Sequence, residues 1–555
     1  MRVHRRIRRV PRRSRVLRWA AGAAVAALAI TSLQSPASAA PDRSVAHYGG
    51  LSATQRASLM TVARDTWKFY SADVDPTTHL PLDNLTYAGG SAAPTGYGRY
   101  TSAANIGVYL WSVVSARDVG LISRTKATTM LRQTLTEVAH LKRDKGFLYQ
   151  WYDTSNGHVI RNPGDVDCNT ETTPTFDNCY FLSNVDNGWY ASGLVVVRQA
   201  LPALRQQADA LMKPMDFGMF YDGRAENHCN VNVNIAGNQP TGQMYGGYYV
   251  GLPPSDPANA THYYHNGALY SDPRISAYIG MGLHQMPGNV WWRSWRELPP
   301  PAPFADCQKT DPDFSWQGQW PMAGAWKTYT DPRSGRKFPV WEGHYHYLAS
   351  DLNFIPTYSG GMFEGLMVND VVPETSWGTH SFGRADAATA AVQIKYATEE
   401  LGYPVWGMSP SSTADDTGGY GGFGVEGQKF PYHGVGATRG QPNLGLAQCV
   451  TCATEDVVTP HASFLALDVA PQRAYANIAK LRRLYPGSYG AGGFFDAVNP
   501  TTGSVGHRYL VLDQSMIMAS LDNALRDRSL QRHFAADPVS RAARTYLGME
   551  NMFLG

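Results

Sequence analysis

Three acidic side chains stand in surroundings typical of catalytic carboxyl groups. Asp186 opens the most apolar predicted helix, within the sequence NVDNGW. Asp272 follows Tyr270 at the start of another apolar helix, where burial would raise the pKa of its carboxyl enough for general-acid catalysis. Glu364 follows a glycine pair and an aromatic residue. One protonated and one ionised carboxyl across a cleft is the pairing that cleavage of a glycosidic bond requires.

Each of these acids also has a purely structural explanation. Asp186 and Asp272 are good helix N-cap residues, and Pro273 suits the first position of a helix. Glu364 fits a buried ion pair with Arg384. Taken alone, the residues leave capping or ion pairing open beside catalysis.

Aromatic residues and missing motifs narrow the class of chemistry. The chain has 14 Trp and 31 Tyr, many in long segments with much Gly and Pro. Rings there offer flat apolar faces for stacking on sugars, although most of them are expected simply to pack. The sequence lacks GxSxG, HExxH, a Walker loop and a GxGxxG after a strand. A glycan-active protein is favoured over a serine hydrolase, a zinc protease or a nucleotide enzyme.

The N-terminal segment predicts export. Residues 1–18 hold nine Arg and no acid, and the apolar run at 19–30 is too short for a stable transmembrane helix. Small residues at 37–39 complete a signal peptide over residues 1–39, so the mature chain is expected to start near Ala40. The sequence RRSRVL at 12–17 also resembles a twin-arginine signal, which leaves the export route open.

Charge argues against a nucleic-acid partner. Nine of the 48 Lys and Arg lie in the signal segment, so 39 basic and 45 acidic residues remain, a net charge of −6. No later stretch clusters Lys and Arg with aromatics as nucleic-acid binders do. The expected partner is a glycan substrate, and the oligomeric state is left open.

Cysteines point to disulfides, and no metal or cofactor is predicted. The even count of six indicates disulfides in an oxidising compartment, with 15 possible connectivities. Proximity favours the pairs Cys168 with Cys179, Cys229 with Cys307, and Cys449 with Cys452. The last pair has no second CxxC for a zinc site. His344 and His346 are expected on opposite faces of an extended segment, which argues against a metal there.

Helical periodicity recurs through residues 40–555, which show no linker composition and are expected to form one domain. One helix is capped at Thr101 or Ser102 and ends before Gly120; another runs from Ser123 towards Gly146. Further helices are predicted at 185–204, 53–70, 272–284, 360–369, 383–401, 460–485, 512–525 and 537–548. Long loops at 245–270 and 316–358 and short strands near 147–152 complete a mainly α fold, an α/α toroid with a cleft at one end.

Seven segments, in order, resemble the glucoamylase-like domain of glycoside hydrolase family 144 and related enzymes that handle β-1,2-glucan. The resemblance extends from about Trp67 to the C-terminus. It implies an (α/α)6 barrel and hydrolysis with inversion, which needs two carboxyl groups roughly 6.5 to 9.5 Å apart. The segments are TSAANIG at 101–107, YQWYDT at 149–154, VDNGW at 185–189, DPRISAYI at 272–279, GMFE at 361–364, WGMS at 406–409 and FFDA at 494–497.

The resemblance also implies residue roles. Asp186 matches the acid at the head of an inner helix and is expected to activate water. Asp272 stands where relatives often carry Glu, so Glu364 or Glu374 are further candidates for the proton donor. Expected sugar contacts are Trp151, Tyr152, Asn187, Trp189, Arg274, Trp377 and Trp406.

We therefore expect a secreted inverting glycoside hydrolase, with β-1,2-glucan as the nearest family substrate. Two alternatives remain open. A polysaccharide lyase on the same toroid would use Tyr, Arg and His around a uronate, with His262, His265, His344 and His346 as the histidines to consider. A non-catalytic glycan-binding protein is suggested by Asp at position 272.

Overall fold

Helices dominate the structure, a computed structural model. It describes residues 48–165, 167–168, 179–223, 242–251, 265–294, 296, 322–347, 352–357, 360–425 and 456–553. The mainly α prediction is confirmed in these residues, where β-strands are short apart from one hairpin. No helix in these ranges is both long enough and apolar enough to cross a lipid bilayer.

The predicted helices are present with small shifts of their ends. Ser102 and Ser123 cap α2 and α3 through their side chains, as the sequence predicts. The segment 460–485 is instead two helices, because Pro471 cannot continue a helix and starts a new one. The helices are α1 Ala53–Ala72, α2 Ala103–Asp118, α3 Arg124–His140, α4 Asn184–Ala200, α5 Arg205–Met212, α6 Arg274–Gly282, α7 Asn289–Arg293, α8 Met362–Val371, α9 Glu374–Trp377, α10 Phe382–Lys395, α11 Pro460–Leu465, α12 Pro471–Leu484, α13 Val511–Leu525, α14 Ser529–Ala535 and α15 Ser540–Met549.

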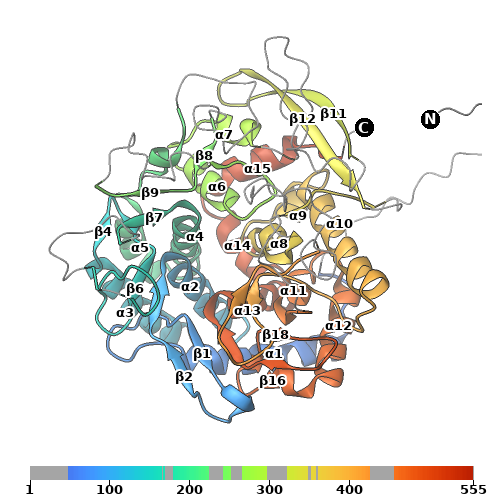
Figure 1. The fold of residues 1–555 in the computed structure, drawn as a ribbon. Helices are drawn as coiled ribbons and strands as arrows, with labels where there is room; N and C mark the ends of the chain where they lie inside the picture. Colours follow the sequence, from blue (N-terminus) through green and yellow to red (C-terminus); the bar gives the residue numbers. More distant parts are fainter. Residues whose placement is uncertain are drawn as a thin grey trace, which may run out of the picture. The chain divides into compact units, whose positions relative to one another are not determined.

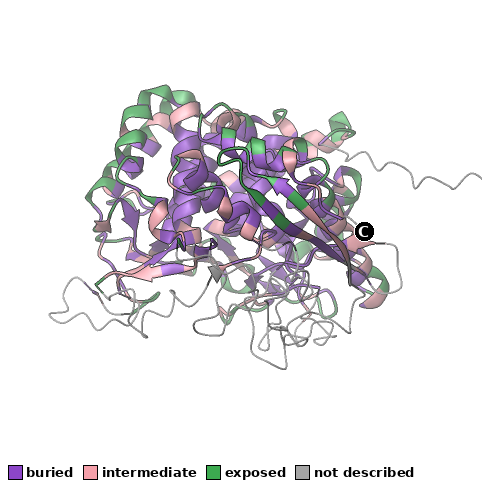
Figure 2. Ribbon diagram, turned by 90° about the horizontal axis from the view of Figure 1, so that it is seen from above, coloured by how far each residue is buried: buried purple, intermediate pink, exposed green. Residues whose placement is uncertain are grey.

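Helices α2, α4, α6, α8, α11 and α13 form the inner part of the fold, with α1, α3, α5, α10 and α12 outside them (Figure 1). Every residue of α2 from Ala103 to Ala116 is buried, which an α-helix tolerates only among other elements. Helix α2 packs against α4 and α13, α4 against α6, and α11 against α8 and α13. Figure 2 shows the buried residues concentrated in these central helices.

Two glycines allow α2 and α4 to approach closely. A Cβ on Gly107 would lie 2.4 Å from the backbone oxygen of Trp189, and one on Gly193 would lie 2.4 Å from the backbone oxygen of Gly107. Neither position has room for a methyl group, because the opposing atoms belong to the backbone. The crossing therefore fixes the position of Trp189, which matters for the acids below.

Short antiparallel strands lead into several inner helices. Strand β3 runs directly into α2, β7 into α4 and β20 into α13. The predicted strand segment 147–152 is confirmed as β5 and β6. The strands are β1 Asn84–Thr86, β2 Gly96–Gly98, β3 Tyr100–Ser102, β4 Arg143–Asp144, β5 Phe147–Leu148, β6 Trp151–Asp153, β7 Phe181–Ser183, β8 Met244–Tyr245, β9 Gly247–Tyr249, β10 His265–Asn266, β11 Met322–Thr330, β12 Lys337–His346, β13 Asn353–Phe354, β14 Ser411–Ser412, β15 Tyr420–Gly421, β16 Tyr489–Gly490, β17 Gly493–Phe494, β18 Ala497–Val498, β19 Val505–Gly506 and β20 Arg508–Leu510.

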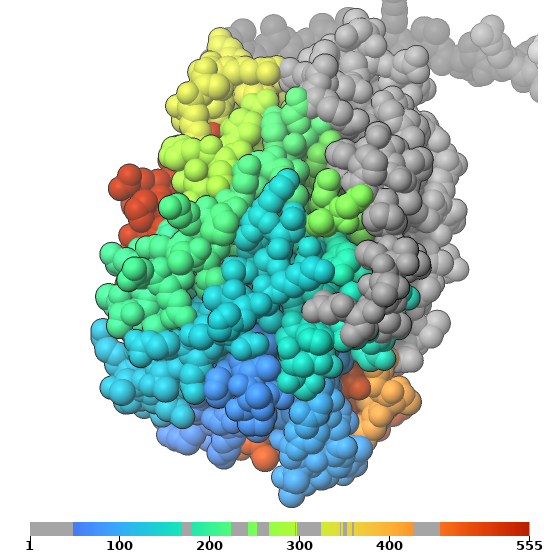
Figure 3. Space-filling view, turned by 90° about the vertical axis from the view of Figure 1, so that its left-hand side faces the viewer, coloured from blue at the N-terminus to red at the C-terminus, as the bar shows by residue number. Residues whose placement is uncertain are grey.

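A long hairpin replaces much of the loop expected at 316–358. Strands β11 and β12 pair along their whole length, with Trp326 opposite Trp341. The hairpin is anchored where Tyr329 stacks on Trp292 of α7 at 4.6 Å between ring centroids and donates a 2.6 Å hydrogen bond to Glu342. In Figure 3 the hairpin, in yellow, adjoins the yellow-green segment that contains α7.

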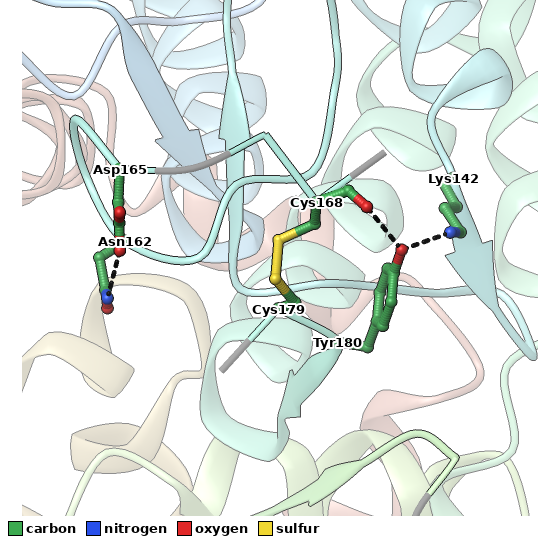
Figure 4. The surroundings of a disulfide bond; sticks show 6 residues. All are labelled: Lys142, Asn162, Asp165, Cys168, Cys179 and Tyr180. Carbon is green, nitrogen blue, oxygen red and sulfur yellow. Dashed lines mark hydrogen bonds between the residues drawn. A yellow bond between two sulfur atoms is a disulfide. The ribbon is translucent and has the colours of Figure 1, made fainter. Parts of the chain in front are cut away.

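One predicted disulfide is confirmed. Cys168 and Cys179 are bonded, and the hydroxyl of Tyr180 donates to the backbone oxygen of Cys168 at 3.0 Å while accepting from Lys142 at 2.9 Å (Figure 4). The pairs Cys229 with Cys307 and Cys449 with Cys452 lie outside the described residues.

Removing this disulfide is expected to destabilise the fold moderately. The bond closes a loop with a sequence separation of 11 residues, and loops of that size contribute about 3 kcal/mol through the entropy of the unfolded chain. Urea denaturation of Cys168→Ser, Cys179→Ser and the double variant checks this. The three losses should agree, because each variant removes the same bond; an unchanged unfolding free energy in the double variant contradicts the prediction.

Candidate active site

The structure brings the three predicted acids to neighbouring helix ends. Asp186 lies in the first turn of α4, Asp272 lies just before α6, and Glu364 lies in the first turn of α8. The carboxyls of Asp272 and Glu364 are hydrogen-bonded to each other, and Asp186 is close enough for the charge of Asp272 to raise its pKa. The expectation that these acids share one site therefore agrees with their placement.

Burial and mutual repulsion favour a proton on the Asp272 and Glu364 pair. Burial raises the pKa of Asp272 well above its ordinary value, and the charge of Glu364 raises it further. Burial also raises the pKa of Glu364, but hydrogen bonds from Asp272 and from the Ser271 hydroxyl, at 2.9 Å, oppose that rise. Two close carboxyls cannot both ionise easily, so the shared proton belongs on Asp272.

The interpretation of Asp186 as the N-cap residue of its helix is wrong. Ser183 caps α4, because its hydroxyl accepts the N–H of Asp186 at 3.3 Å. The half-buried carboxyl of Asp186 accepts from its own backbone N–H, in the first turn of α4, and from the backbone N–H of Ala104 at the start of α2. Burial raises the pKa of Asp186, and the charge of Asp272 adds to the rise, whereas the hydrogen bonds from Ser183 and Ala104 oppose it.

The structural roles considered for Asp272 and Glu364 are also wrong. Asp272 makes no capping hydrogen bond to α6; its Oδ2 accepts the indole N–H of Trp189 at 3.2 Å. Glu364 does not pair with Arg384, whose guanidinium donates to the backbone oxygen of Met552 and lies over the ring of Phe553. Neither acid therefore caps a helix or pairs with Arg384, although the nearby charge of Arg274 opposes the rise in the pKa of both.

Arg274 is a positioning residue, and its prediction as a sugar contact is wrong. Its side chain is 2% exposed and donates two 2.7 Å hydrogen bonds to the carboxylate of Glu374. The remaining three donors go to the backbone oxygens of Ser271, Glu364 and Gly365. No guanidinium hydrogen of Arg274 is left to bind a sugar. Glu374 is the ion-pair partner of Arg274, so it is not available as a proton donor.

Three further predicted sugar contacts lie in the protein interior. Tyr152 is fully buried and donates to the backbone oxygen of Lys142. Asn187 is fully buried and exchanges 2.9 Å hydrogen bonds with the backbone of Leu148. Trp189 is 2% exposed, and its indole N–H donates a hydrogen bond to Asp272. These side chains support the acids or the strands around them and offer no surface for stacking.

The other three tryptophans predicted as sugar contacts differ in exposure and in position. Trp151 is half-buried, edge-on to Tyr100 with 5.7 Å between ring centroids, and stays a predicted sugar contact. Trp377 lies beyond the C-terminal end of α8, next to Arg544, and thus away from Glu364 in the first turn. Trp406 is 5% exposed and held through its backbone by Asn477. Burial leaves little of the Trp406 ring for a sugar, whereas the half-buried Trp377 stays a predicted sugar contact.

The histidines of β12 do not join the acids. His344 and His346 lie on the same face of the strand, with ring centroids 5.7 Å apart, because side chains two residues apart in a strand point the same way. The expectation of opposite faces is therefore wrong. His344 is buried against Phe553. His262 and the side chain of His265 lie outside what the structure describes.

Sequence reasoning missed a second polar cluster at the N-terminal ends of α11 and α13. It consists of His461, Asp496 and Asp513, all buried. Asp496 is part of the resembling segment FFDA, which was the available signal. The half-exposed Tyr420 lies within electrostatic range of Asp496, Asp513 and Glu364, so both clusters occupy the same end of the inner helices.

Two family models match parts of the chain. Residues 341–538 match the family model described as putative glucoamylase, and residues 61–224 match one described as a protein of unknown function, DUF3131. A curated relative, the cyclic β-(1,2)-glucan synthase NdvB of Rhizobium meliloti (strain 1021), is 24% identical over 88% of this chain. The chain spans only 18% of that relative's length.

Solved structures show the same fold. The endo-β-1,2-glucanase from Chitinophaga pinensis, in complex with sophorotriose and glucose, superposes with a TM-score of 0.59 at 15% identity, over 90% of this chain and 98% of its own. A putative glucoamylase from Bacteroides caccae gives 0.59 at 16% identity, over 89% and 100%. The endo-β-1,2-glucanase from Talaromyces funiculosus with sophorose gives 0.56 at 11% identity, over 90% and 92%.

The chain therefore has the fold of the endo-β-1,2-glucanases and glucoamylase-like proteins. The resemblance inferred from the seven sequence segments is confirmed by the family model and by these structures.

Proposed function

We propose that the protein is an exported glycoside hydrolase that cleaves β-1,2-glucan with inversion of configuration. The observation that carries this proposal is the hydrogen-bonded carboxyl pair of Asp272 and Glu364 beside Asp186. It offers one acid held protonated and another carboxyl nearby to take a proton from water. The fold shared with endo-β-1,2-glucanases and the NdvB relative support β-1,2-glucan as the substrate.

The proposed reaction uses one proton transfer on each side of the glycosidic bond. Asp272 gives its proton to the leaving oxygen as the bond from the anomeric carbon breaks. Asp186 takes a proton from a water whose oxygen attacks that carbon from the opposite face. Glu364 stays ionised and holds the proton of Asp272 in place beforehand. Solvent then returns both acids to their starting states.

The same proposal includes an (α/α)6 toroid. Helices α2, α4, α6, α8, α11 and α13 would be its inner ring, because α2 packs on α4, α4 on α6, α8 on α11, α11 on α13 and α13 on α2. Arg274 supports the α6 to α8 step, since it donates to the backbone of Glu364 and Gly365. The acids then lie at one end of the ring, where inner-helix N-termini favour negative charge.

Export and a single catalytic domain over residues 40–555 complete the proposal. The Arg-rich start, the apolar run at 19–30 and the small residues at 37–39 support a cleaved signal. The confirmed disulfide supports an oxidising compartment.

A panel of polysaccharides tests the function. The purified protein is incubated with β-1,2-glucan, arabinans and galactans, and reducing ends and product sizes are measured. Fragments from β-1,2-glucan, with the anomeric configuration inverted by NMR, support the proposal. An unsaturated product that absorbs in the ultraviolet would indicate a lyase, and binding without new ends would indicate a glycan-binding protein; either result overturns it.

Asp186→Asn is expected to lower kcat on β-1,2-glucan by about 10³-fold, because an amide cannot take a proton from water. The KM should change little, since the amide keeps the shape and hydrogen-bonding reach of the carboxyl. Steady-state kinetics checks this, with Asp527→Asn as the matched control on an exposed acid whose side chain is 98% accessible. Equal turnover in the Asp186 variant and the control would remove Asp186 from the mechanism.

A further inference from the structure

His461, Asp496 and Asp513 form a compact set of potential ligands that the proposed reaction does not use. They come from α11, from the turn between β17 and β18, and from the first turn of α13. One nitrogen or oxygen atom from each residue lies within 4.8 Å of the other two. Their exposed fractions are 1%, 2% and 0%, so the set lies in the interior.

Three of the four carboxylate oxygens of this cluster accept no hydrogen bond from an N–H or from a Ser, Thr or Tyr hydroxyl in the described part of the chain. They are both side-chain oxygens of Asp513 and Oδ1 of Asp496. A buried polar atom without a partner costs free energy, and native proteins pair nearly all of them. The carboxyls of Asp496 and Asp513 are close enough to share a proton between them. A metal ion that displaced this proton would contact oxygens that no other donor holds.

The ligand atoms are held in position by neighbours. The backbone N–H of Ser412 donates to Oδ2 of Asp496 at 2.6 Å, which leaves Oδ1 directed elsewhere. The ring of His461 is fixed by the Thr459 hydroxyl, 2.8 Å from Nδ1, and that nitrogen lies 3.5 Å from Oδ2 of Asp513. Such outer contacts orient the ligands of protein metal sites.

The charge around the cluster fits a divalent cation. Asp83 interacts with Asp513, and Arg508 interacts with both Asp83 and Asp496. Burial raises the pKa of all three carboxyls, so the cluster favours the uptake of positive charge. One divalent ion can supply that charge in place of protons.

We propose that His461, Asp496 and Asp513 bind one divalent transition-metal ion, Zn²⁺ or Mn²⁺. An imidazole nitrogen with two carboxylate oxygens is a donor set that suits these ions better than Ca²⁺, which takes oxygen ligands. Metal bonds of about 2.0 to 2.2 Å place the ligand atoms closer together than the widest separation here, so binding draws the side chains slightly inward. Water completes the coordination.

The proposed metal site uses residues other than the proposed catalytic acids. Experiments can therefore refute metal binding and glucan hydrolysis independently of each other. Metal binding is measured on the protein without substrate, and hydrolysis is measured by reducing ends. A protein that cleaves glucan yet binds no metal keeps the function and loses this site. The alternative is that sugar hydroxyls, rather than a metal ion, reach the orphaned oxygens.

Equilibrium dialysis with elemental analysis tests the site. The full chain, purified without a histidine tag and treated with chelator, is dialysed against Zn²⁺ or Mn²⁺. We expect about one ion per chain, a raised melting temperature with metal, and loss of both in Asp513→Asn and His461→Gln. Asp527→Asn, which removes one exposed carboxylate, should bind as the wild type does.

Two results overturn the proposal. One is a wild-type chain that retains neither ion; the other is undiminished binding in Asp513→Asn, which places the ion elsewhere. X-ray absorption of the loaded wild-type protein gives an answer that needs no variant: nitrogen and oxygen neighbours with one imidazole are expected. A shell with sulfur, or with two or more imidazoles, contradicts the proposed ligands even if the variants fail to fold.

Discussion

Asp272→Asn is expected to lower kcat on β-1,2-glucan by about 10²- to 10⁴-fold, the usual contribution of a general acid. The amide keeps both neighbours, since its oxygen can accept from Trp189 and its N–H₂ can donate to Glu364, which now bond to the carboxyl. Only the transferable proton is lost. Steady-state kinetics on the purified variant, with KM expected to stay within a few-fold, checks this.

A rise in stability should accompany that loss of activity. The pKa of Asp272 is raised in the folded protein, so its protonated form stabilises the fold below pH 4 and that contribution disappears as pH rises towards the folded pKa. Asn does not titrate, so at neutral pH the melting temperature of the variant should equal or exceed that of the wild type. A lower melting temperature with matching loss of activity would assign Asp272 a structural role instead.

The pH profile gives an independent check on the same acid. Wild-type kcat should fall on the alkaline side as Asp272 loses its proton, and on the acid side as Asp186 gains one. In Asp272→Asn the alkaline fall should be absent from the residual activity. If the variant keeps the wild-type alkaline limb, another group supplies the proton.

Helices with strong local signals could be predicted from sequence. Ser102 and Ser123 precede helical periodicity and cap the expected helices. Prediction failed where tertiary contacts decide the structure. The β11 to β12 hairpin does carry a turn signal, DPRSG at 331–335. What anchors the hairpin, however, is the packing of Tyr329 on Trp292, residues far apart in the chain. Helix α14 is short and has no side-chain cap, so its sequence carries little signal.

The acids could be predicted from sequence, but their surroundings could not. Asp186, Asp272 and Glu364 each head an apolar helix, and only the fold shows that the three helices begin beside one another. Aromatic type proved a poor guide to sugar contact. Trp189 is buried because α2 approaches α4 closely at Gly107. Trp406 is buried in a loop that contacts the start of α8, where the hydroxyl of Ser409 accepts the backbone N–H of Phe363. Sequence reveals an aromatic ring but not which face of it is covered.

The buried ion pair of Arg274 with Glu374 predicts the largest loss of stability. Glu374→Gln leaves the guanidinium, 2% exposed, without a negative partner, and also weakens the 2.6 Å hydrogen bond from Tyr278. Breaking such a pair costs about 3 to 5 kcal/mol. Urea denaturation checks this, with Glu399→Gln as the control: its pair with Lys395 is solvent-exposed and worth less than about 1 kcal/mol.

A double variant of the same ion pair can separate its effect on stability from its effect on the position of the catalytic acids. Arg274 donates to the backbone oxygens of Ser271, Glu364 and Gly365, so it sets where Asp272 and Glu364 meet. A double variant with Met at both 274 and 374 should recover much of the lost stability, because apolar residues can replace a buried ion pair. It should not recover turnover, since the backbone contacts that align α6 with α8 are gone. Recovery of both would mean that the acids hold their geometry without Arg274.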